Sequence, residues 1–292
     1  MYPPASPTVN GTKITVEQYL KQPTRVERQL NNLALERFLA DKIFGKGTAE
    51  GGAVIYDRIT ENSLYLEREV QVIEPGSNFP ILNDSDTGAN VAVVEKHGGG
   101  VIITYEDGRR DRRDKLKRES TRLVNTITRK TDTRALAILD KDPDIPTAAG
   151  TDWSDPATRD AIGDIAGAMS QINNSDLGYN TTMAIVNPVQ ALALFGDKSI
   201  RDALPRENKN DNPIASGTIN GLMGLTWYES NRVPVGTAWF MGGQQVGSIH
   251  DEIPQYTRVV DDQLRERWVI MGARVAVPVV TDPFAAFKLT GL

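Results

Sequence analysis

Residues 109–141, RRDRRDKLKRESTRLVNTITRKTDTRALAILDK, decide the fold. Apolar residues such as Leu116, Leu123 and Leu139 recur at spacings of three, four and seven, which is the period of one helix face. Asp142-Pro143 ends the pattern, because a proline disfavours helical geometry in the residue before it. The stretch predicts a helix over about 110–141. About 29 residues at 1.5 Å each would reach roughly 44 Å, more than twice the average globular helix.

The other faces of this predicted helix are basic. They carry Arg112, Arg113, Lys115, Lys117, Arg118, Arg122, Arg129, Lys130 and Arg134. Such a face is typical of a helix that binds nucleic acid, or of one that faces solvent or the acidic groups of a neighbouring subunit. We favour the second interpretation. The chain has 33 basic and 38 acidic residues, a net charge of -5, whereas proteins that grip phosphates usually carry a basic excess.

The 292 residues suffice for one or two domains with a core. The absence of cysteine excludes disulfides, thiolate metal sites and cysteine nucleophiles. The N-terminus lacks the features of a signal peptide, and no run of 18 apolar residues is present. We therefore expect the chain to fold in a cytoplasm, without a membrane partner.

The segment before residue 46 reads as an arm followed by a helix. Residues 1–23 are rich in Pro and Thr and predict an extended arm, which Val16, Tyr19 and Leu20 could anchor. Thr24 to Glu27 has the spacing of a capping box, so a helix should follow and end near Phe44-Gly45. This helix could lie in the core or on a neighbouring subunit.

Residues 46–100 predict a projecting β-hairpin. Glycines bracket the segment, ending with His97-Gly98-Gly99-Gly100, which we expect to be a flexible hinge. Strand-like runs at 53–59, 65–73 and 91–94 are separated by turn residues. Two arms of about 15 to 18 residues would reach roughly 50 Å. The apolar residues are too sparse to build a core, so the hairpin needs another surface to lie on.

The second half of the chain mixes helices and strands without a βαβ rhythm, which predicts an α+β fold. Helices should begin at Asp155-Pro156, with a stripe from Ile162 to Ile172, and at Asn187-Pro188, ending at Phe195-Gly196. Residues 197–220 predict a mobile loop. The predicted strands are 183–186, 222–228, 237–241, 246–249 and a long, buried 267–280.

No motif in the sequence predicts catalysis, a cofactor or a metal. His97-Gly98-Gly99-Gly100 matches an oxyanion loop of some esterases, but the G-x-S-x-G motif of the nucleophile is absent. His250 beside Asp251 is a weak signal, because neighbours on a strand point to opposite faces. Asp140, Asp142 and Asp144 begin like a calcium loop, yet the required glycine and glutamate are missing.

Several motifs, in their order, resemble a known family. They are Ala184-Ile185-Val186-Asn187-Pro188, then Gly221 to Leu225 followed by Val233-Pro234-Val235-Gly236-Thr237-Ala238, and finally Arg274 through Pro283-Phe284-Ala285-Ala286-Phe287-Lys288-Leu289. The pattern, with an arm, a hairpin and a long helix, resembles the major capsid proteins of tailed double-stranded-DNA bacteriophages, which have the HK97-like fold. The resemblance covers nearly the whole chain.

The resemblance implies a division of the chain. It comprises an N-terminal arm at 1–48, an E-loop at 49–100, a P-domain at 101–175 with its spine helix, an A-domain at 176–262, and a return strand with the C-terminal tail at 263–292. It implies a structural, non-enzymatic subunit of a virion, which assembles in the host cytoplasm as hexamers and pentamers into an icosahedral shell around double-stranded DNA. Contact with the DNA would be non-specific, and the mild negative charge suits such a shell.

Contacts between subunits are expected to use charged residues. The candidates are Arg58, Glu67, Arg68 and Glu69 of the E-loop, opposite the spine residues Arg112 and Arg118. Some family members join an E-loop lysine to a P-domain asparagine covalently. Here no lysine lies between Lys46 and Lys96 and no asparagine follows Asn231, so we expect no cross-links.

Only about 50 residues precede the E-loop, so we expect any scaffolding protein or protease to be separate, or a cleaved scaffolding segment to be already absent. Portal and decoration proteins should be separate partners. The alternative within the same fold is an encapsulin-like shell around an enzyme cargo. A hydrolase using His97 and a nucleoid-like DNA-binding protein are further, weaker alternatives. The first lacks a nucleophile, and the second predicts tight, salt-sensitive DNA binding.

Overall fold

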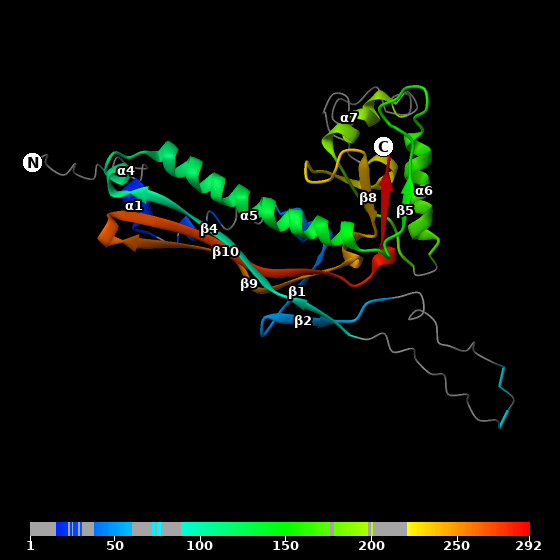
Figure 1. The fold of residues 1–292 in the computed structure, drawn as a ribbon, viewed down its shortest axis with the longest axis horizontal. Coiled ribbons are helices and arrows are strands. Elements are labelled where there is room, and N and C mark those ends of the chain that lie inside the picture. Colours follow the sequence, from blue (N-terminus) through cyan, green and yellow to red (C-terminus); the bar gives the residue numbers. More distant parts are fainter. Residues whose placement is uncertain are drawn as a thin grey trace, which may run out of the picture.

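The computed structural model describes residues 16–22, 24, 26–28, 30, 38–59, 72–73, 75–76, 89–175, 178–197, 200 and 221–292. Its helices and strands are mixed, which confirms the predicted α+β class. Two bodies are visible in Figure 1: an elongated one along the long helix, and a compact one at the far end of that helix. Within these ranges, no helix has the length and apolarity needed to cross a membrane.

The elongated body is a four-stranded sheet with one long helix on one face (Figure 1). The strand order is β1-β9-β10-β4. The strands are β1 (Gly45–Thr48), β4 (Glu95–Thr104), β9 (Gly247–Asp262) and β10 (Arg267–Val280). β10 pairs antiparallel with both β9 and β4, and β1 runs parallel to β9. The predicted buried strand 267–280 is therefore confirmed in full.

The long helix is α5 (Arg113–Lys141), and its predicted end at Asp142 is confirmed. Its predicted start near residue 110 is wrong. A separate helix α4 (Tyr105–Arg109) precedes it, and Asp111 between them has a positive φ of 47°, which interrupts helical geometry. Leu123 and Ile127 of α5 pack on Trp268 and other apolar residues of the sheet.

The glycines before α5 are not a hinge, in contrast to the sequence-based expectation. His97 to Gly100 lie inside β4 and pair with Arg274 to Met271 of β10. A Cβ on Gly98 would lie 2.6 Å from the Cβ of Ala273. The glycine therefore allows close strand packing, which turn-like composition alone does not reveal.

The compact body is a five-stranded sheet in the order β5-β11-β8-β6-β7, flanked by two helices. Its strands are β5 (Thr147–Ala149), β6 (Met183–Val186), β7 (Thr226–Glu229), β8 (Thr237–Met241) and β11 (Ala286–Thr290). Its helices are α6 (Ala161–Asn173) and α7 (Pro188–Gly196). The predicted cap of α7 is confirmed, since the Asn187 side chain accepts from the amide of Val189.

Helix α6 begins later than predicted. Asp155 accepts hydrogen bonds from Ala157 and Thr158 and so caps a turn. The helix cap is Asp160, whose carboxylate accepts from the amide of Gly163 at 3.0 Å. Two aspartates five residues apart thus compete for the same role, and the second one starts the helix.

The N-terminal segment reaches back onto the elongated body. Val16 and Leu20 are buried and anchor the segment, as predicted, while the side chain of Tyr19 lies outside the described residues. The predicted extended conformation is wrong here, because residues 16–20 form the helix α1 (Val16–Leu20). The predicted single helix up to Phe44 is interrupted: Phe38 is not helical, and a new helix α3 (Ala40–Ile43) follows. The interruption has a cause in the fold, because the amides of Leu39 and Ala40 donate to Asp132 of α5.

The base of the predicted hairpin is present. β2 (Ala53–Tyr56) and β3 (Asn90–Val93) pair antiparallel. Val54 packs on Val277 and Val279 of β10. Most of the hairpin beyond this base, like the predicted loop 197–220, lies outside the described residues.

Sheet membership differs from the expected segment boundaries. The boundary at 262 separates β9 from β10, although the two strands pair along their length. The tail strand β11 and helix α6 pack in the compact body, not with the return strand. Short 3₁₀ turns complete the chain, namely Leu222–Gly224, Gly243–Gln245, Gln263–Arg265 and Pro283–Ala285.

Candidate assembly surfaces

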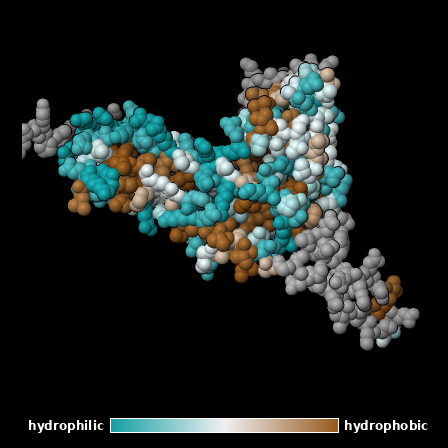
Figure 2. Space-filling model, viewed as in Figure 1, coloured by the Kyte–Doolittle hydropathy of each residue, from teal (hydrophilic) through white to brown (hydrophobic). Residues whose placement is uncertain are grey.

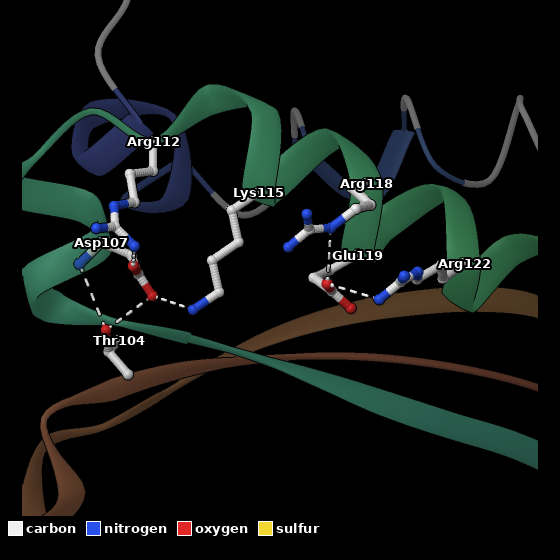
Figure 3. Close-up of polar contacts among 7 residues, drawn as sticks. All are labelled: Thr104, Asp107, Arg112, Lys115, Arg118, Glu119 and Arg122. Atoms are coloured by element: carbon white, nitrogen blue, oxygen red, sulfur yellow. Dashed lines mark hydrogen bonds and ion pairs between the residues drawn. The ribbon is translucent and has the colours of Figure 1, made fainter.

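The start of the long helix is tied to α4 by one carboxylate, as Figure 3 shows. The Asp107 side chain is buried, and it accepts from Lys115, from the Thr104 hydroxyl at 2.9 Å and from Arg112 at 3.3 Å. The hydrogen bond from Lys115 lowers the pKa of the Asp107 carboxyl, and the Thr104 hydroxyl adds to this effect. Asp107 therefore stays ionised and holds the α4–α5 corner.

A second ionic group follows one turn later. Glu119 accepts from Arg118 at 3.3 Å and from Arg122 at 3.2 Å (Figure 3). The predicted contact residues Arg112 and Arg118 thus both have acidic partners in their own chain. Their side chains remain 52% and 61% exposed, so their outer edges can still meet another molecule.

Arg58 fixes the hairpin base to the far end of the same helix. Its guanidinium pairs with Asp142 and, at 2.7 Å, with Asp144. The next amide, of Ile59, donates to the carbonyl of Thr281 at 2.8 Å. The other predicted E-loop contacts, Glu67, Arg68 and Glu69, lie outside the described residues.

A groove of about 460 Å³ opens between the hairpin base and this helix end. Val277 to Val280 form its floor, and Tyr56 and Arg58 stand on one side with Arg134 and Lys141 on the other. Its lining combines an apolar floor with charged walls. This combination suits a polypeptide segment better than a small metabolite, whose pockets are more enclosed.

The outer face of the hairpin base is apolar, which the sequence analysis did not single out. Ile55, Val91 and Val93 are 73%, 65% and 66% exposed, and Ile55 and Val91 are direct cross-strand partners. Hydrophobic surface at the hairpin base is visible in Figure 2. Val91 and Val93 alternate with the half-buried Ala92 and Val94, and this period-2 alternation indicates a strand with two different faces. An exposed cluster of this kind marks a contact surface.

Two buried ionic groups hold the bodies and the N-terminal segment together. Arg274 of β10 is 4% exposed, pairs with Asp41 of α3 at 2.8 Å and with Asp251 of β9 at 2.7 Å, and lies over the ring of Phe38. Burial opposes the charge of Arg274, but the hydrogen bonds that it donates to Asp251 and the charge of Asp41 raise its pKa. The guanidinium therefore remains charged inside the fold.

Asp132 of α5 is the second buried group, with its side chain 1% exposed. One oxygen accepts from the amides of Leu39 and Ala40, both at 3.0 Å, and the other lies 3.3 Å from Arg232. Burial raises the pKa of this carboxyl. Asp132 joins the long helix, α3 and the segment after β7.

The histidines are used structurally. His97 contacts Arg134 at 3.2 Å and Glu95 at 3.3 Å, and burial lowers its pKa, as does the charge of Arg134. His250 lies between the Ser248 hydroxyl at 2.7 Å and the carbonyl of Thr48 at 3.1 Å. In the part of the chain that the structure describes, no three His, Cys, Asp or Glu side chains gather into a group that could hold a metal.

The architecture defines a class of protein: a structural subunit with surfaces that only other molecules can cover. The uncovered hairpin base, the open groove and the elongated sheet all fit a component of an assembly. Residues 88–289 match the model of the phage capsid protein family, and the chain belongs to this family. It is a structural capsid protein, as the sequence resemblance predicted.

Solved structures with the same fold support this assignment. The capsid of cyanophage P-SCSP1u is 13% identical, with a TM-score of 0.63 over 87% of this chain and 88% of that one. A phage-related protein from Bordetella bronchiseptica RB50 is 11% identical, with a TM-score of 0.61 over 90% and 96%. A virus-like particle from Pyrococcus furiosus is 10% identical, with a TM-score of 0.60 over 90% and 97%. These likenesses confirm the HK97-like fold; a search of curated proteins finds no significant match.

Proposed function

We propose that this chain is the principal shell subunit of a tailed phage and that it assembles as hexamers and pentamers into an icosahedral shell around double-stranded DNA. The family match over residues 88–289 carries the proposal. The uncovered apolar hairpin base supports it, because a two-stranded hairpin is stable only against a further surface. In this proposal the chain has no catalytic role, and its place is the virion, after assembly in the host cytoplasm.

In the proposed contacts, the hairpin of one copy meets the start of the long helix of another copy. The hairpin carries Arg58, Glu67, Arg68 and Glu69, and the α4 end carries Arg112 and Arg118. The apolar face of Ile55, Val91 and Val93 adds a contact that excludes water. Scaffolding, portal and decoration proteins, if used, are separate partners.

The encapsulin-like alternative also has an observation behind it, the likeness to the virus-like particle from Pyrococcus furiosus. Its TM-score of 0.60 is close to the 0.63 of the cyanophage capsid, and at 10% identity the likeness concerns the fold alone. What the particle encloses separates the two functions.

The test is expression of the full chain, size-exclusion chromatography and negative-stain electron microscopy. Closed shells or rings of five and six subunits are expected. Nucleic acid inside particles made in the presence of the other head proteins supports the phage function, whereas a co-purified enzyme without DNA supports the cargo shell. A chain that stays monomeric with all head proteins present contradicts both.

A further inference from the structure

Basic charge is concentrated on the long helix and its approach. Residues 109–134 contain 11 of the 33 basic residues but only four of the 38 acidic ones. The chain as a whole has a net charge of -5, so the remainder is strongly acidic. The molecule therefore has one basic strip on an acidic surface, and a polyanion would be attracted to that strip and repelled elsewhere.

The two halves of the strip differ in how their charges are compensated. At the α4 end, Asp107 and Glu119 pair with the nearby cations (Figure 3), and Asp111 pairs with Arg113. From residue 120 to 139 the only acid is Asp132, which is buried and already engaged by α3 and Arg232. Arg122 shares Glu119 with Arg118, but beyond it the middle of the helix presents Arg129 and Lys130 with no acidic side chain of the helix beside them.

Three cations of the helix face outward, and we name them the mid-helix stripe: Arg122, which keeps one pairing with Glu119, and the neighbouring Arg129 and Lys130. Arg122 is 66% exposed, and the other two are also exposed. Arg129 and Lys130 form no ion pair with any residue that the structure describes. Arg122 and Arg129 are seven residues, or about two helical turns, apart, so they lie nearly in line about 10 Å from each other. Arg134, by contrast, is turned inward to Glu95 and the carbonyl of Ala276.

The sheet separates the stripe from the hairpin. Trp268 and Ile270 of β10 pack against α5, whereas Val277 and Val279 pack against the hairpin base. Figure 1 shows α5 on one side of the strands and β2 on the other. In a shell of equivalent subunits, hairpin bases would share one surface and mid-helix stripes the other. A neighbour's acidic hairpin lying on the first surface would leave the stripe uncovered.

We propose that the mid-helix stripe faces the inside of the shell and binds the phosphates of the packaged DNA without reading its sequence. The inference rests on the proposed shell function. Each cation that neutralises a phosphate releases a counterion and contributes about -0.9 to the slope of log K against log salt. Three cations per copy bind weakly alone, but the repetition of the stripe over the shell multiplies the effect.

The test measures binding of a fluorescent 30-base-pair duplex to unassembled full-length protein by anisotropy, at a series of salt concentrations. The triple variant R122E/R129E/K130E should bind at least about tenfold more weakly at 50 mM salt, and its salt slope should fall by about 2 to 3. The neutral variant R122Q/R129Q/K130Q should lose less affinity for the duplex than the charge-reversed variant does. The control K46E/K96E/R265E makes the same change in net charge at exposed residues away from α5, and its affinity should stay within about threefold.

Two results would overturn the inference. Equal losses in the control and the stripe variant would mean that overall charge, and not the stripe, attracts DNA. Unchanged DNA binding with loss of shell formation in the stripe variant would mean that the stripe meets an acidic surface of another copy. Closed wild-type shells should not bind added duplex, and binding from outside through the stripe would contradict its inward orientation. Failure of the proposed function is seen separately, as absence of wild-type shells in the microscope.

Discussion

Asp132 shows how a single buried residue connects segments that are far apart in the chain. Replacing it with alanine leaves the amides of Leu39 and Ala40 and the guanidinium of Arg232 without their partner. We expect Asp132→Ala to lower the free energy of unfolding by about 2–4 kcal/mol, measured by chemical denaturation of the unassembled chain. The exposed Thr133→Ala on the same helix is the control and should cost less than about 0.5 kcal/mol. Equal effects of the two would refute the role of Asp132.

Asp107 gives a prediction about pH. The pKa of its carboxyl is lowered in the folded chain, so its stabilising contribution is complete above the ordinary pKa near 4 and is lost as the pH falls through the folded value. Asp107→Asn should therefore be less stable than the wild type by about 1–2 kcal/mol at pH 7. The difference should shrink toward zero below about pH 4. A difference in unfolding free energy that does not change between pH 7 and pH 3 would contradict the ionised pairing with Lys115.

At the scale of the element, the glycines of β4 distinguish a packed strand from a hinge. Gly98→Ala places a methyl group 2.6 Å from Ala273 and 2.8 Å from the carbonyl of Gly272, so it should cost about 1–3 kcal/mol in unfolding free energy. Gly100→Ala makes ordinary contacts, with Met271 at 3.4 Å, Val269 at 3.5 Å and the carbonyl of Ile270 at 3.6 Å, and should cost less than about 1 kcal/mol. If both substitutions were tolerated equally, residues 97–100 would behave as the hinge that their composition suggests.

The elements that sequence predicts well are those defined by their own residues. The end of α5 follows from Asp142-Pro143, the start of α7 from Asn187-Pro188, and β10 from its long run rich in valine and other apolar residues. The elements it misplaces are set by distant partners. The break before α3 depends on Asp132, some 90 residues away, and the strand at Gly98 depends on β10.

The same limit applies to the candidate contact surfaces. Charge patterns direct attention to Arg112 and Arg118. The partner of Arg118 is the adjacent Glu119, whereas the pairing of Arg112 with Asp107 becomes visible only once α4 and α5 are placed. The apolar face of Ile55, Val91 and Val93 depends on which side of the hairpin lies on β10. Periodicity gives the alternation in β3 but not the identity of the covered side.

At the scale of the whole molecule, the shell should be held by non-covalent contacts alone. No lysine lies between Lys46 and Lys96, and no asparagine follows Asn231, so the two groups that form a cross-link in some family members are missing. Assembled particles boiled in SDS should run as a single band at 32.0 kDa. A ladder of covalent dimers and higher multiples would refute this prediction.

The central claim is that this chain builds a shell from copies of itself. Mass photometry of particles purified after expression, alone and together with the other head proteins, tests it most directly. We expect a population of megadalton mass that is a whole-number multiple of 32.0 kDa, with rings of five or six copies at lower concentration. A mass of 32.0 kDa under all these conditions would contradict it.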